Sequence, residues 1–409
     1  MGHAILDCEV CGTSGLTKVL DLGNHPLCDD LVPVGDPRFP ETYPIDIAFC
    51  PNCKTAHQSH QVPKRTLFPN SYHYRARHTA DVLSGMRQLV ERCEKQVGTL
   101  KDLLVLDVGC NDGSLLSIFR EHGARTIGVE PTGAAADAKA VGHAVHQDYF
   151  TPELAEKLAS AGRPDIITFT NVFAHIEDLR SLLSAVGKLM GPSTLLVVEN
   201  HYLGAVLDRF QFDTFYHEHP RTYSLSSFRH IAKSLQATIE VLEFPARYGG
   251  NIRVMMRRGD GSAPANPDIV AAENAEADYQ QRLVDMAKRI PAWRNNKRAE
   301  IEAAVSRHGP LVGKAFPGRA AILVKLLDLD VSLLSAVYEK PGSMKIGHYI
   351  PGTRIPILSD DDFVGRPDRT VPLLNLAWHI SSEIHGYMRK NGYEGPIIDI
   401  FSAEEFGRT

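Results

Sequence analysis

Residues 103–115 read Leu103-Leu-Val-Leu-Asp-Val-Gly-Cys-Asn-Asp-Gly-Ser-Leu115. The first six residues form a short apolar run of the kind that a buried parallel strand needs, and Gly109 and Gly113 allow a tight turn before a helix begins. Further apolar runs with helical patterns between them follow at Thr126–Glu130, Ile166–Thr170 and Thr194–Glu199. The stretch therefore predicts an α/β domain with a doubly wound, Rossmann-like sheet.

The side chains around the glycine turn indicate which ligand it binds. The glycine spacing alone is weak evidence, because dinucleotide sites use a similar turn. Asp107 lies in the strand just before the loop, and Asn111 and Asp112 stand where a pyrophosphate would prefer uncharged backbone. A carboxylate beside the loop suits an ammonium group such as that of methionine. Glu130 ends the next strand, where it can accept hydrogen bonds from two ribose hydroxyls. The pattern favours S-adenosylmethionine over a nicotinamide nucleotide or a purely structural loop.

Residues after the third and fourth strands complete the expected cofactor site. Asp148 lies with two aromatic residues where a further strand, the third in chain order and between the runs at 126–130 and 166–170, should end. This group can contact the adenine. Asn171 follows the fourth strand and closes the site. The expected cofactor-binding residues are Asp107, Gly109, Asn111, Asp112, Gly113, Glu130, Pro131, Asp148, Tyr149, Phe150 and Asn171.

Two C-x-x-C pairs near the N-terminus predict a metal site. Cys8 and Cys11 form one knuckle, and Cys50 and Cys53 form the other. Two such turns can complete a tetrahedral four-thiolate zinc site, which leaves no open position and is therefore structural. The spacing between the pairs is longer than usual, and the alternative is a set of buried or redox-active cysteines.

Composition limits the classes of function. The chain has 409 residues and a formal net charge of -5, and Lys and Arg never form a long run. We therefore expect no nucleic-acid partner. No apolar stretch is long enough to span a bilayer. The chain has seven cysteines, four of them in two C-x-x-C pairs, and an odd total with this pairing is typical of metal binding in a reducing cytoplasm. We expect a cytoplasmic monomer or small homo-oligomer without membrane contact.

Changes in amino-acid composition and in the pattern of expected strands and helices along the chain suggest three domains. Residues 1–70 are rich in Pro, Cys and His and form the expected zinc-binding domain. Residues 71–258 contain the four apolar runs between residues 103 and 199 and form the expected cofactor domain. Residues 259–409 begin with a charged helical pattern and continue as a smaller α/β domain that completes the acceptor site.

The segment Tyr216-His-Glu-His219-Pro is a dense cluster of ionisable groups. It has three interpretations: a second metal site using His217 and His219, a solvated surface, or acid–base chemistry. An extended strand would place the two histidines on one face and Glu218 on the other. Acid–base chemistry is favoured, because a histidine titrates near neutral pH and a neighbouring carboxylate can tune it.

The order of motifs resembles the zinc-containing sugar C-methyltransferases, which methylate C-3 of nucleotide-linked 4-keto-6-deoxy sugars. The resemblance covers nearly the whole chain. Besides the C-x-x-C pairs and the glycine turn, it rests on Leu20-Asp-Leu-Gly-Asn-His-Pro26, Tyr72-His-Tyr74, Asn171-Val-Phe-Ala-His-Ile-Glu-Asp178, Tyr216-His-Glu-His219, Tyr248-Gly-Gly-Asn-Ile-Arg253 and Tyr349-Ile-Pro-Gly-Thr-Arg-Ile-Pro356.

The resemblance implies roles for individual residues. It makes His219 the general base that removes a proton beside a ketone, with an enolate as intermediate. The implied catalytic group is His219, Glu218, Tyr216, His175, Tyr72 and Tyr74. The implied substrate-binding motifs contribute Asn251, Arg253, Tyr349 and Arg354. The acceptor is then a small molecule, expected to be a nucleotide-linked keto-sugar.

Two departures from the family pattern concern the acceptor. The tyrosine segment continues as Arg75-Ala-Arg77, where relatives have serines, and the C-terminal loop has Arg319 in place of the usual Ala-Lys-Gly-Asn stretch. Arginines suit phosphate or carboxylate, so Arg75, Arg77 and Arg319 join the expected substrate-binding residues. Surface ion pairs are the alternative for these arginines. O- or N-methylation of a related sugar or polyol, or a non-catalytic cofactor-binding protein, are the alternatives for the whole chain.

Overall fold

The computed structural model describes residues 3–68, 74–259, 267–364 and 370–406. The chain forms two compact units, and each is described by itself. The first contains Met1–Lys18, Ala48–Asp208 and Glu218–Gln280; the second contains Val19–Ile47, Arg209–His217 and Gln281–Thr409. The domain limits expected from the sequence stay a prediction.

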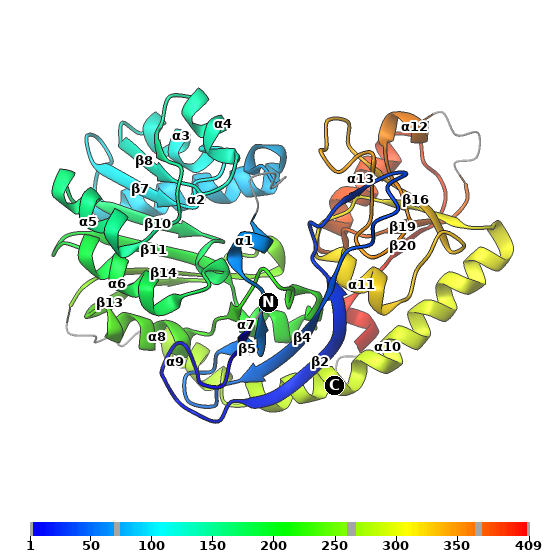
Figure 1. Ribbon diagram of the computed structural model, residues 1–409, viewed down its shortest axis with the longest axis horizontal. Helices are drawn as coiled ribbons and strands as arrows, with labels where there is room; N and C mark the ends of the chain where they lie inside the picture. The colour runs from blue at the N-terminus through cyan, green and yellow to red at the C-terminus, as the bar shows by residue number, and fades with distance from the viewer. Residues whose placement is uncertain (1–2, 69–73, 260–266, 365–369, 407–409) are drawn as a thin grey trace. The chain divides into compact units, whose positions relative to one another are not determined.

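A seven-stranded sheet forms the centre of the first unit, with strands in the order β13-β14-β11-β10-β7-β8-β9 (Figure 1). The strands are β7 (Leu104–Val108), β8 (Arg125–Val129), β9 (Ala144–His146), β10 (Ile166–Thr170), β11 (Leu195–His201), β13 (Ala237–Glu243) and β14 (Asn251–Arg258). Strands β11 to β9 are parallel, whereas β14 is antiparallel to both β11 and β13. The Rossmann-like fold class is confirmed, and such sheets bind ligands at the carboxyl ends of their parallel strands.

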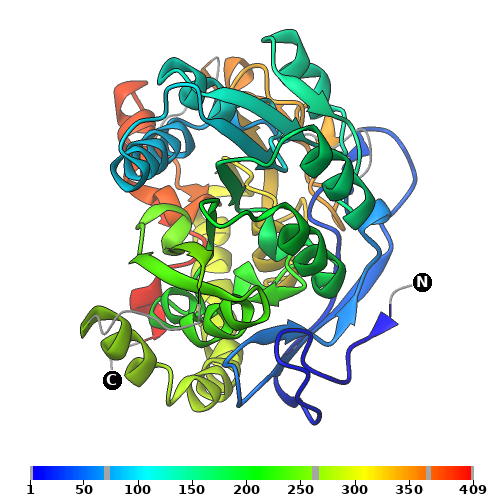
Figure 2. The same cartoon turned by 90° about the vertical axis from the view of Figure 1, so that its left-hand side faces the viewer.

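Helices cover both faces of this sheet (Figures 1 and 2). They are α2 (Ala80–Val97), α3 (Ser114–Glu121), α4 (Ala134–Ala140), α5 (Pro152–Ala161), α6 (Leu179–Leu189), α7 (Leu203–Asp208), α8 (Leu225–Ser234) and α9 (Pro267–Ala275), with the short α1 (Lys64–Leu67) before them. Thr151 and Asp178 cap α5 and α6, because each side chain accepts a hydrogen bond from a backbone N–H of the first turn.

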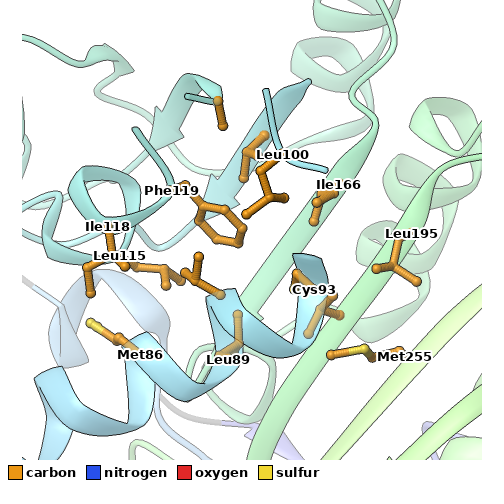
Figure 3. Packing of buried hydrophobic residues seen from close by; sticks show 14 of the residues in the cluster. Met86, Leu89, Cys93, Leu100, Leu115, Ile118, Phe119, Ile166, Leu195 and Met255 are labelled. Carbon is orange, nitrogen blue, oxygen red and sulfur yellow. The ribbon is translucent and has the colours of Figure 1, made fainter. Parts of the chain in front are cut away.

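An apolar core lies between α2, α3 and the sheet (Figure 3). Leu89 and Cys93 of α2 pack with Phe119 of α3 against Leu195 and Met255 on the strands, and all five side chains are fully buried. Burying a large apolar side chain contributes about 1.5–3 kcal/mol to stability. This packing fixes the sheet, and the loops at its carboxyl edge are held on a rigid base.

The N-terminal segment is divided between the two units. Strands β1 (His3–Ala4) and β6 (His60–Gln61) pair in the first unit. A four-stranded sheet has the order β12-β5-β4-β2. Its strands are β2 (Thr17–Pro26), β4 (Thr42–Phe49), β5 (Ala56–Gln58) and β12 (Arg221–Thr222). The chain leaves the first unit along β2 and returns along β4.

The second unit contains a five-stranded parallel sheet of order β18-β16-β15-β19-β20. Its strands are β15 (Leu311–Lys314), β16 (Leu334–Glu339), β18 (Ile357–Ser359), β19 (Leu373–Asn375) and β20 (Ile397–Asp399). The helices are α10 (Tyr279–His308), α11 (Ala320–Leu326), α12 (Asp360–Val364) and α13 (Ser381–Lys390), and β3 (Val32–Pro33) pairs with β17 (His348–Tyr349). The expected smaller α/β element pattern is present.

The four strands expected from the sequence match β7, β8, β10 and β11 closely, and β13 and β14 were not expected. Tyr216–His219 is not a strand, because the chain turns at His217 and Glu218. The face assignments that assumed an extended backbone there do not hold. Among the described residues, no helix is long and apolar enough to cross a membrane.

Candidate functional site

The four cysteines of the two C-x-x-C pairs come together in the first unit. Their sulfur atoms all lie within 4.8 Å of one another, and within the described ranges they are the one group of His, Cys, Asp and Glu side chains that fits a metal ion. Cys8 Sγ is 3.3 Å from Cys53 Sγ, and Cys11 Sγ is 3.6 Å from Cys50 Sγ. Four convergent thiol groups are the ligand set of a closed structural zinc site. Within the same ranges, His217 and His219 are not part of such a group, so the metal interpretation of these histidines gains no support.

Polar side chains surround the cysteine cluster and orient its sulfurs. His57 Nε2 lies 3.3 Å from Cys8 Sγ, and the Thr55 hydroxyl lies 3.0 Å from Cys53 Sγ. Such groups donate hydrogen bonds to zinc-bound thiolates and fix their direction. The donor set and its surroundings therefore both fit zinc.

The glycine turn between β7 and α3 requires both of its glycines. Gly109 and Gly113 have φ angles of 75° and 78°, in the left-handed region. A Cβ added to Gly109 would lie 2.4 Å from the side chain of Val172. Val172 follows β10, so the absence of a side chain at Gly109 allows two ligand-facing loops to approach each other closely. This cradle fits a bound nucleoside.

Two acidic side chains lie beside this turn. Glu130, just after β8, accepts hydrogen bonds from the backbone N–H groups of Asn111 (3.0 Å) and Thr132 (2.8 Å). Asp107 in β7 is 3% exposed and accepts a hydrogen bond from the Thr168 hydroxyl at 2.7 Å. Burial raises the pKa of Asp107 to about 7 although the Thr168 bond opposes the shift, and the negative charge of Glu130 raises it further. A buried carboxyl group in this state favours a cationic ligand.

The side chains of Asn111 and Asp112 hold the segment 74–77 against the glycine turn. Asn111 accepts a hydrogen bond from the Ala76 N–H and donates one to the Tyr74 carbonyl. Asp112 accepts from the Arg77 N–H at 2.9 Å. The tyrosine–arginine segment therefore lies on the expected cofactor loop. Tyr72 lies outside the described residues.

Arg75 and Arg77 share a carboxylate partner. Nε of Arg75 donates to Asp137 Oδ2 of α4 at 2.6 Å, and Arg77 lies 3.4 Å from Asp137 Oδ1. The side chain of Arg77 is 46% exposed, whereas that of Arg75 is 11% exposed. The two cations stand at the edge of the cofactor loop, with the charge of one carboxylate between them.

The other expected cofactor residues also lie at the carboxyl edge of the sheet. Asp148, after β9, is exposed, and the ring of its neighbour Tyr149 lies under the Lys64 ammonium. Phe150 contacts Phe169 edge-to-face. Asn171 has a φ of 53°, and its side-chain oxygen accepts a hydrogen bond from Asn251. Pro131 follows Glu130 in the turn after β8 and is half-buried.

Three imidazole rings meet at this edge. The His219 ring centroid lies 4.9 Å from that of His175 and 5.1 Å from that of His201. The other side of His175 stacks on Phe68 at 5.3 Å. Burial lowers the pKa of His175 to about 4, so this ring is neutral near neutral pH. His219, the expected base, therefore has two histidine neighbours.

Tyr216 and His217 belong to the second unit, whereas Glu218 and His219 belong to the first. His217 Nε2 donates to the Tyr43 carbonyl at 3.1 Å, and its ring lies edge-on to the Tyr43 ring. His217, Glu218 and His219 are all buried. The contact with Tyr43 gives His217 a structural partner that distinguishes it from His219.

A network of buried charges lies beside the histidines at the end of β11. Glu199, fully buried, accepts hydrogen bonds from Arg253 Nε (2.7 Å) and Asn251 Nδ2 (3.0 Å), and Arg247 Nε lies 3.4 Å away. Among the described residues, Oδ1 of Asn251 and the side-chain amide of Asn200 are buried without a hydrogen-bond partner. Buried amides normally find partners, so these two point to a ligand or ordered water.

The expected substrate residues of the second unit already have protein partners. Arg319 forms a two-pronged ion pair with Asp213 at 2.6 and 2.8 Å, and the Trp378 ring N–H also donates to Asp213. Arg354 donates to the carbonyls of residues 36 and 37, and the Tyr349 hydroxyl accepts from the backbone N–H of residue 35. Binding of an acceptor by these residues stays a prediction.

Family models match three consecutive parts of the chain. Residues 8–68 match a family described as "Putative zinc binding domain", and residues 75–242 match a family described as "Methyltransferase domain". Residues 246–396 match a family described as "C-methyltransferase C-terminal domain". C-methyltransferase NovU of Streptomyces niveus is 29% identical over 386 residues, which are 92% of this chain and 91% of that protein. These matches confirm the resemblance of the chain to the zinc-containing C-methyltransferases.

Other relatives match a smaller part of the chain. A ubiquinone biosynthesis O-methyltransferase of Rhodopseudomonas palustris is 33% identical over 111 residues, 26% of this chain and 44% of its own length. The solved magnesium protoporphyrin IX methyltransferase of Synechocystis, with bound SAH, has a TM-score of 0.35 and 16% identity, and the match covers 44% of this chain and 84% of that one. The family matches confirm the expected enzyme class, an S-adenosylmethionine-dependent methyltransferase, with zinc as the expected metal.

The sequence did not indicate every residue of the methyltransferase site. His201 is the last residue of β11, two residues beyond the expected end of this strand, and a polar residue at the carboxyl end of a buried parallel strand is the signal that points to it. Glu199 and Arg247 gave no such signal, because a charged residue in a sequence does not show that it is buried.

Proposed function

We propose that the enzyme transfers a methyl group to a carbon beside the ketone of a nucleotide-linked sugar. The observation that carries the proposal is the position of His219 beside two further imidazoles at the carboxyl edge of the sheet. The cofactor supplies a methyl group on a positively charged sulfur. The protein must then supply a base for the carbon acid and hydrogen-bond donors for the enolate oxygen.

His219 is the proposed base. It takes the proton of the carbon–hydrogen bond, the electron pair of that bond moves into the enolate, and the proton stays on the imidazole. The neutral state of His175 supports this assignment, because a charged imidazole at 4.9 Å would make a second positive charge on His219 less favourable. His175, Glu218, Tyr216, Tyr72 and Tyr74 are the proposed acceptor contacts.

The polar groups at the end of β11 suit a sugar. The unpartnered amide of Asn200 and the unpartnered oxygen of Asn251 offer hydrogen bonds of the kind that hydroxyl groups accept and donate. Arg253 holds Glu199 in place, so its proposed role is to position Asn251. These groups lie in the same unit as His219.

The anionic part of the acceptor is assigned to Arg75 and Arg77. Their position on the glycine turn brings positive charge close to the proposed transfer site, and Arg77 is largely exposed. Arg319 is held by Asp213, and Arg354 is held by backbone carbonyls, so their proposed part is to shape the second unit. The free thiols of the chain are in keeping with a reducing compartment, and we place the reaction in the cytoplasm.

The test is exchange of the acceptor's α-proton in heavy water, with S-adenosylhomocysteine in the cofactor site. A panel of nucleotide-linked 4-keto sugars is incubated with the enzyme, and incorporation of deuterium is followed by NMR. We expect exchange with wild type and loss of exchange with His219→Asn. Exchange that persists in the variant would assign the base to another residue. A methylated product without any exchange in wild type would favour transfer to oxygen or nitrogen.

A further inference from the structure

Glu9 connects the first zinc knuckle to the rest of the first unit. It lies between Cys8 and Cys11 in the sequence, and its carboxylate accepts hydrogen bonds from Arg221 at 2.6 Å and Gln61 at 2.7 Å. Its Oε2 also lies 3.7 Å from His57 Nδ1, whose other ring nitrogen reaches Cys8 Sγ. Glu9 therefore contacts both a side chain that orients a thiol and a remote arginine.

Arg221 continues this path to the loop that carries His175. Its side chain is fully buried. Its Nη1 donates to Glu9 and to the Glu177 carbonyl at 3.3 Å, and its Nη2 donates to the Ile176 carbonyl. These two carbonyls directly follow His175. One guanidinium thus contacts both the zinc knuckle and the His175 loop.

Strand β5 contacts the backbone on both sides of the Pro220–Arg221 peptide bond, directly after His219. Arg221 lies in β12, where it pairs with His57 of β5, and the Gln58 N–H donates to the Pro220 carbonyl at 2.8 Å. Strand β5 begins three residues after Cys53. Both knuckles therefore connect, through short and buried contacts, to the backbone beside His175 and His219.

We propose that Glu9 and Arg221 are positioning residues, and that zinc binding sets the geometry of His175 and His219 through them. The inference rests on the proposed function only where turnover is measured. The ion pair is a strong positional constraint, because Arg221 is fully buried and removal of Glu9, which is 20% exposed, leaves this charge uncompensated. The zinc site then acts on catalysis without contact between the metal and the acceptor.

The first experiment compares Glu9→Gln with wild type by hydrogen–deuterium exchange and mass spectrometry. Amide exchange is followed in peptides that cover residues 173–180 and 217–223, with zinc content and S-adenosylhomocysteine affinity measured in parallel. We expect one zinc per chain and unchanged cofactor affinity in the variant, with amide exchange at least about tenfold faster in both peptides. Turnover should fall by about 10- to 100-fold, the usual effect of a lost partner beside a metal site, and the acceptor's KM should change less. Glu9→Asp should restore part of the turnover.

Glu240→Gln is the matched control. Glu240 also accepts hydrogen bonds from an arginine and a glutamine, Arg257 at 2.6 Å and Gln96 at 3.3 Å, but it lies on edge strand β13. Glu240→Gln should leave amide exchange in both peptides unchanged, and turnover as well. Equal loosening in this variant, or unchanged exchange in Glu9→Gln, would overturn the proposal.

A double variant, Glu9→Gln with Arg221→Gln, covers the case in which the single variant fails to fold. It removes both charges of the pair together and still abolishes the guanidinium bonds to the 176 and 177 carbonyls. Faster exchange in residues 173–180 supports the proposal, and wild-type exchange overturns it. The hydrogen–deuterium exchange measurement needs no methyl acceptor. Failure of every keto-sugar in the turnover assay would therefore count against the proposed function, while the exchange result decides the role of Glu9 and Arg221.

Discussion

His219 and His217 are separated by one residue, and the structure gives them different partners. His217 donates to the Tyr43 carbonyl in the second unit, whereas His219 contacts two imidazoles in the first. A side chain held by a backbone carbonyl is suited to structure. A side chain among titratable rings at the ligand edge of a sheet is suited to proton transfer. Sequence spacing alone could not make this distinction.

His219→Asn should lower turnover by about 10² to 10⁴, the usual contribution of a general base, while cofactor affinity stays constant. His217→Asn should lower thermal stability and reduce turnover much less, because it removes a contact outside the histidine cluster. Steady-state kinetics and calorimetry with S-adenosylhomocysteine check both. The assignment fails if His217→Asn is the variant that loses turnover while His219→Asn keeps it.

Cofactor affinity should depend on pH through Asp107. Its pKa of about 7 in the free enzyme means that it is largely protonated in mild acid, and an ammonium group favours the ionised form. Binding should therefore release protons, and affinity should rise with pH up to about pH 7.5, by at most about tenfold per unit for one proton. Calorimetry in buffers of different ionisation enthalpy measures this release. Asp107→Asn should make cofactor affinity independent of pH over this range. If the affinity of wild type is already independent of pH, Asp107 does not contact the ammonium group of the cofactor.

At the residue scale, the sequence shows what chemistry a motif can perform but not what surrounds it. The cysteine pairs and the glycine turn were predictable because their spacing determines their geometry. Arg221 was not, because an arginine is normally exposed and its burial depends on Glu9, which is more than 200 positions away. Within the part of the chain that the structure describes, the unpartnered amide of Asn200 and the unpartnered oxygen of Asn251 are likewise visible only once the strands are paired.

At the scale of elements, β7, β10 and β11 were predictable because each is a short, mainly apolar run buried on both faces. Strands β13 and β14 escaped notice because they are antiparallel: β13 alternates buried and half-buried positions, and charged side chains interrupt β14. Their consequence for the site is direct. β14 begins at Asn251, opposite His201 of β11, and so places an amide beside the histidines.

The segment 74–77 gives a prediction at this scale. Arg75→Ala with Arg77→Ala should raise the acceptor's KM several-fold, because two cations are lost from the proposed anion site, and should leave cofactor affinity unchanged. Asp137→Asn is the control, since it removes the shared carboxylate and keeps both cations. It should leave the KM unchanged or lower it. If both variants raise the KM equally, the arginines act only through their ion pairs with Asp137, and the assignment of the anion to them fails.

At the scale of the whole molecule, the described residues form a mixed seven-stranded sheet in the first unit and a parallel five-stranded sheet in the second, and the N-terminal segment is divided between the units. Fold class and zinc ligands followed from the sequence, because apolar periodicity and cysteine spacing are local signals. The division of the N-terminal segment between the units did not. It depends on where β2 and β4 find partners, which is a property of the folded chain.

The zinc site should contribute to the stability of the whole chain. Wild type should contain one zinc per molecule after dialysis against a weak chelator, because four thiolates enclose the ion completely. Cys8→Ser should lose the metal and melt at a lower temperature, because the free energy of zinc binding stabilises only the folded state.

Cys93→Ser is the control for this prediction, since Cys93 is fully buried in the apolar core of the first unit and belongs to no metal site. It should also lower the melting temperature, because it buries a hydroxyl group, but should keep one zinc per chain. Addition of a strong chelator then separates the two causes: it should lower the melting temperature of wild type and of Cys93→Ser, and leave Cys8→Ser unchanged. If wild type contains no zinc, or melts at the same temperature with and without chelator, the prediction is wrong. The four cysteines are then buried thiols and not metal ligands.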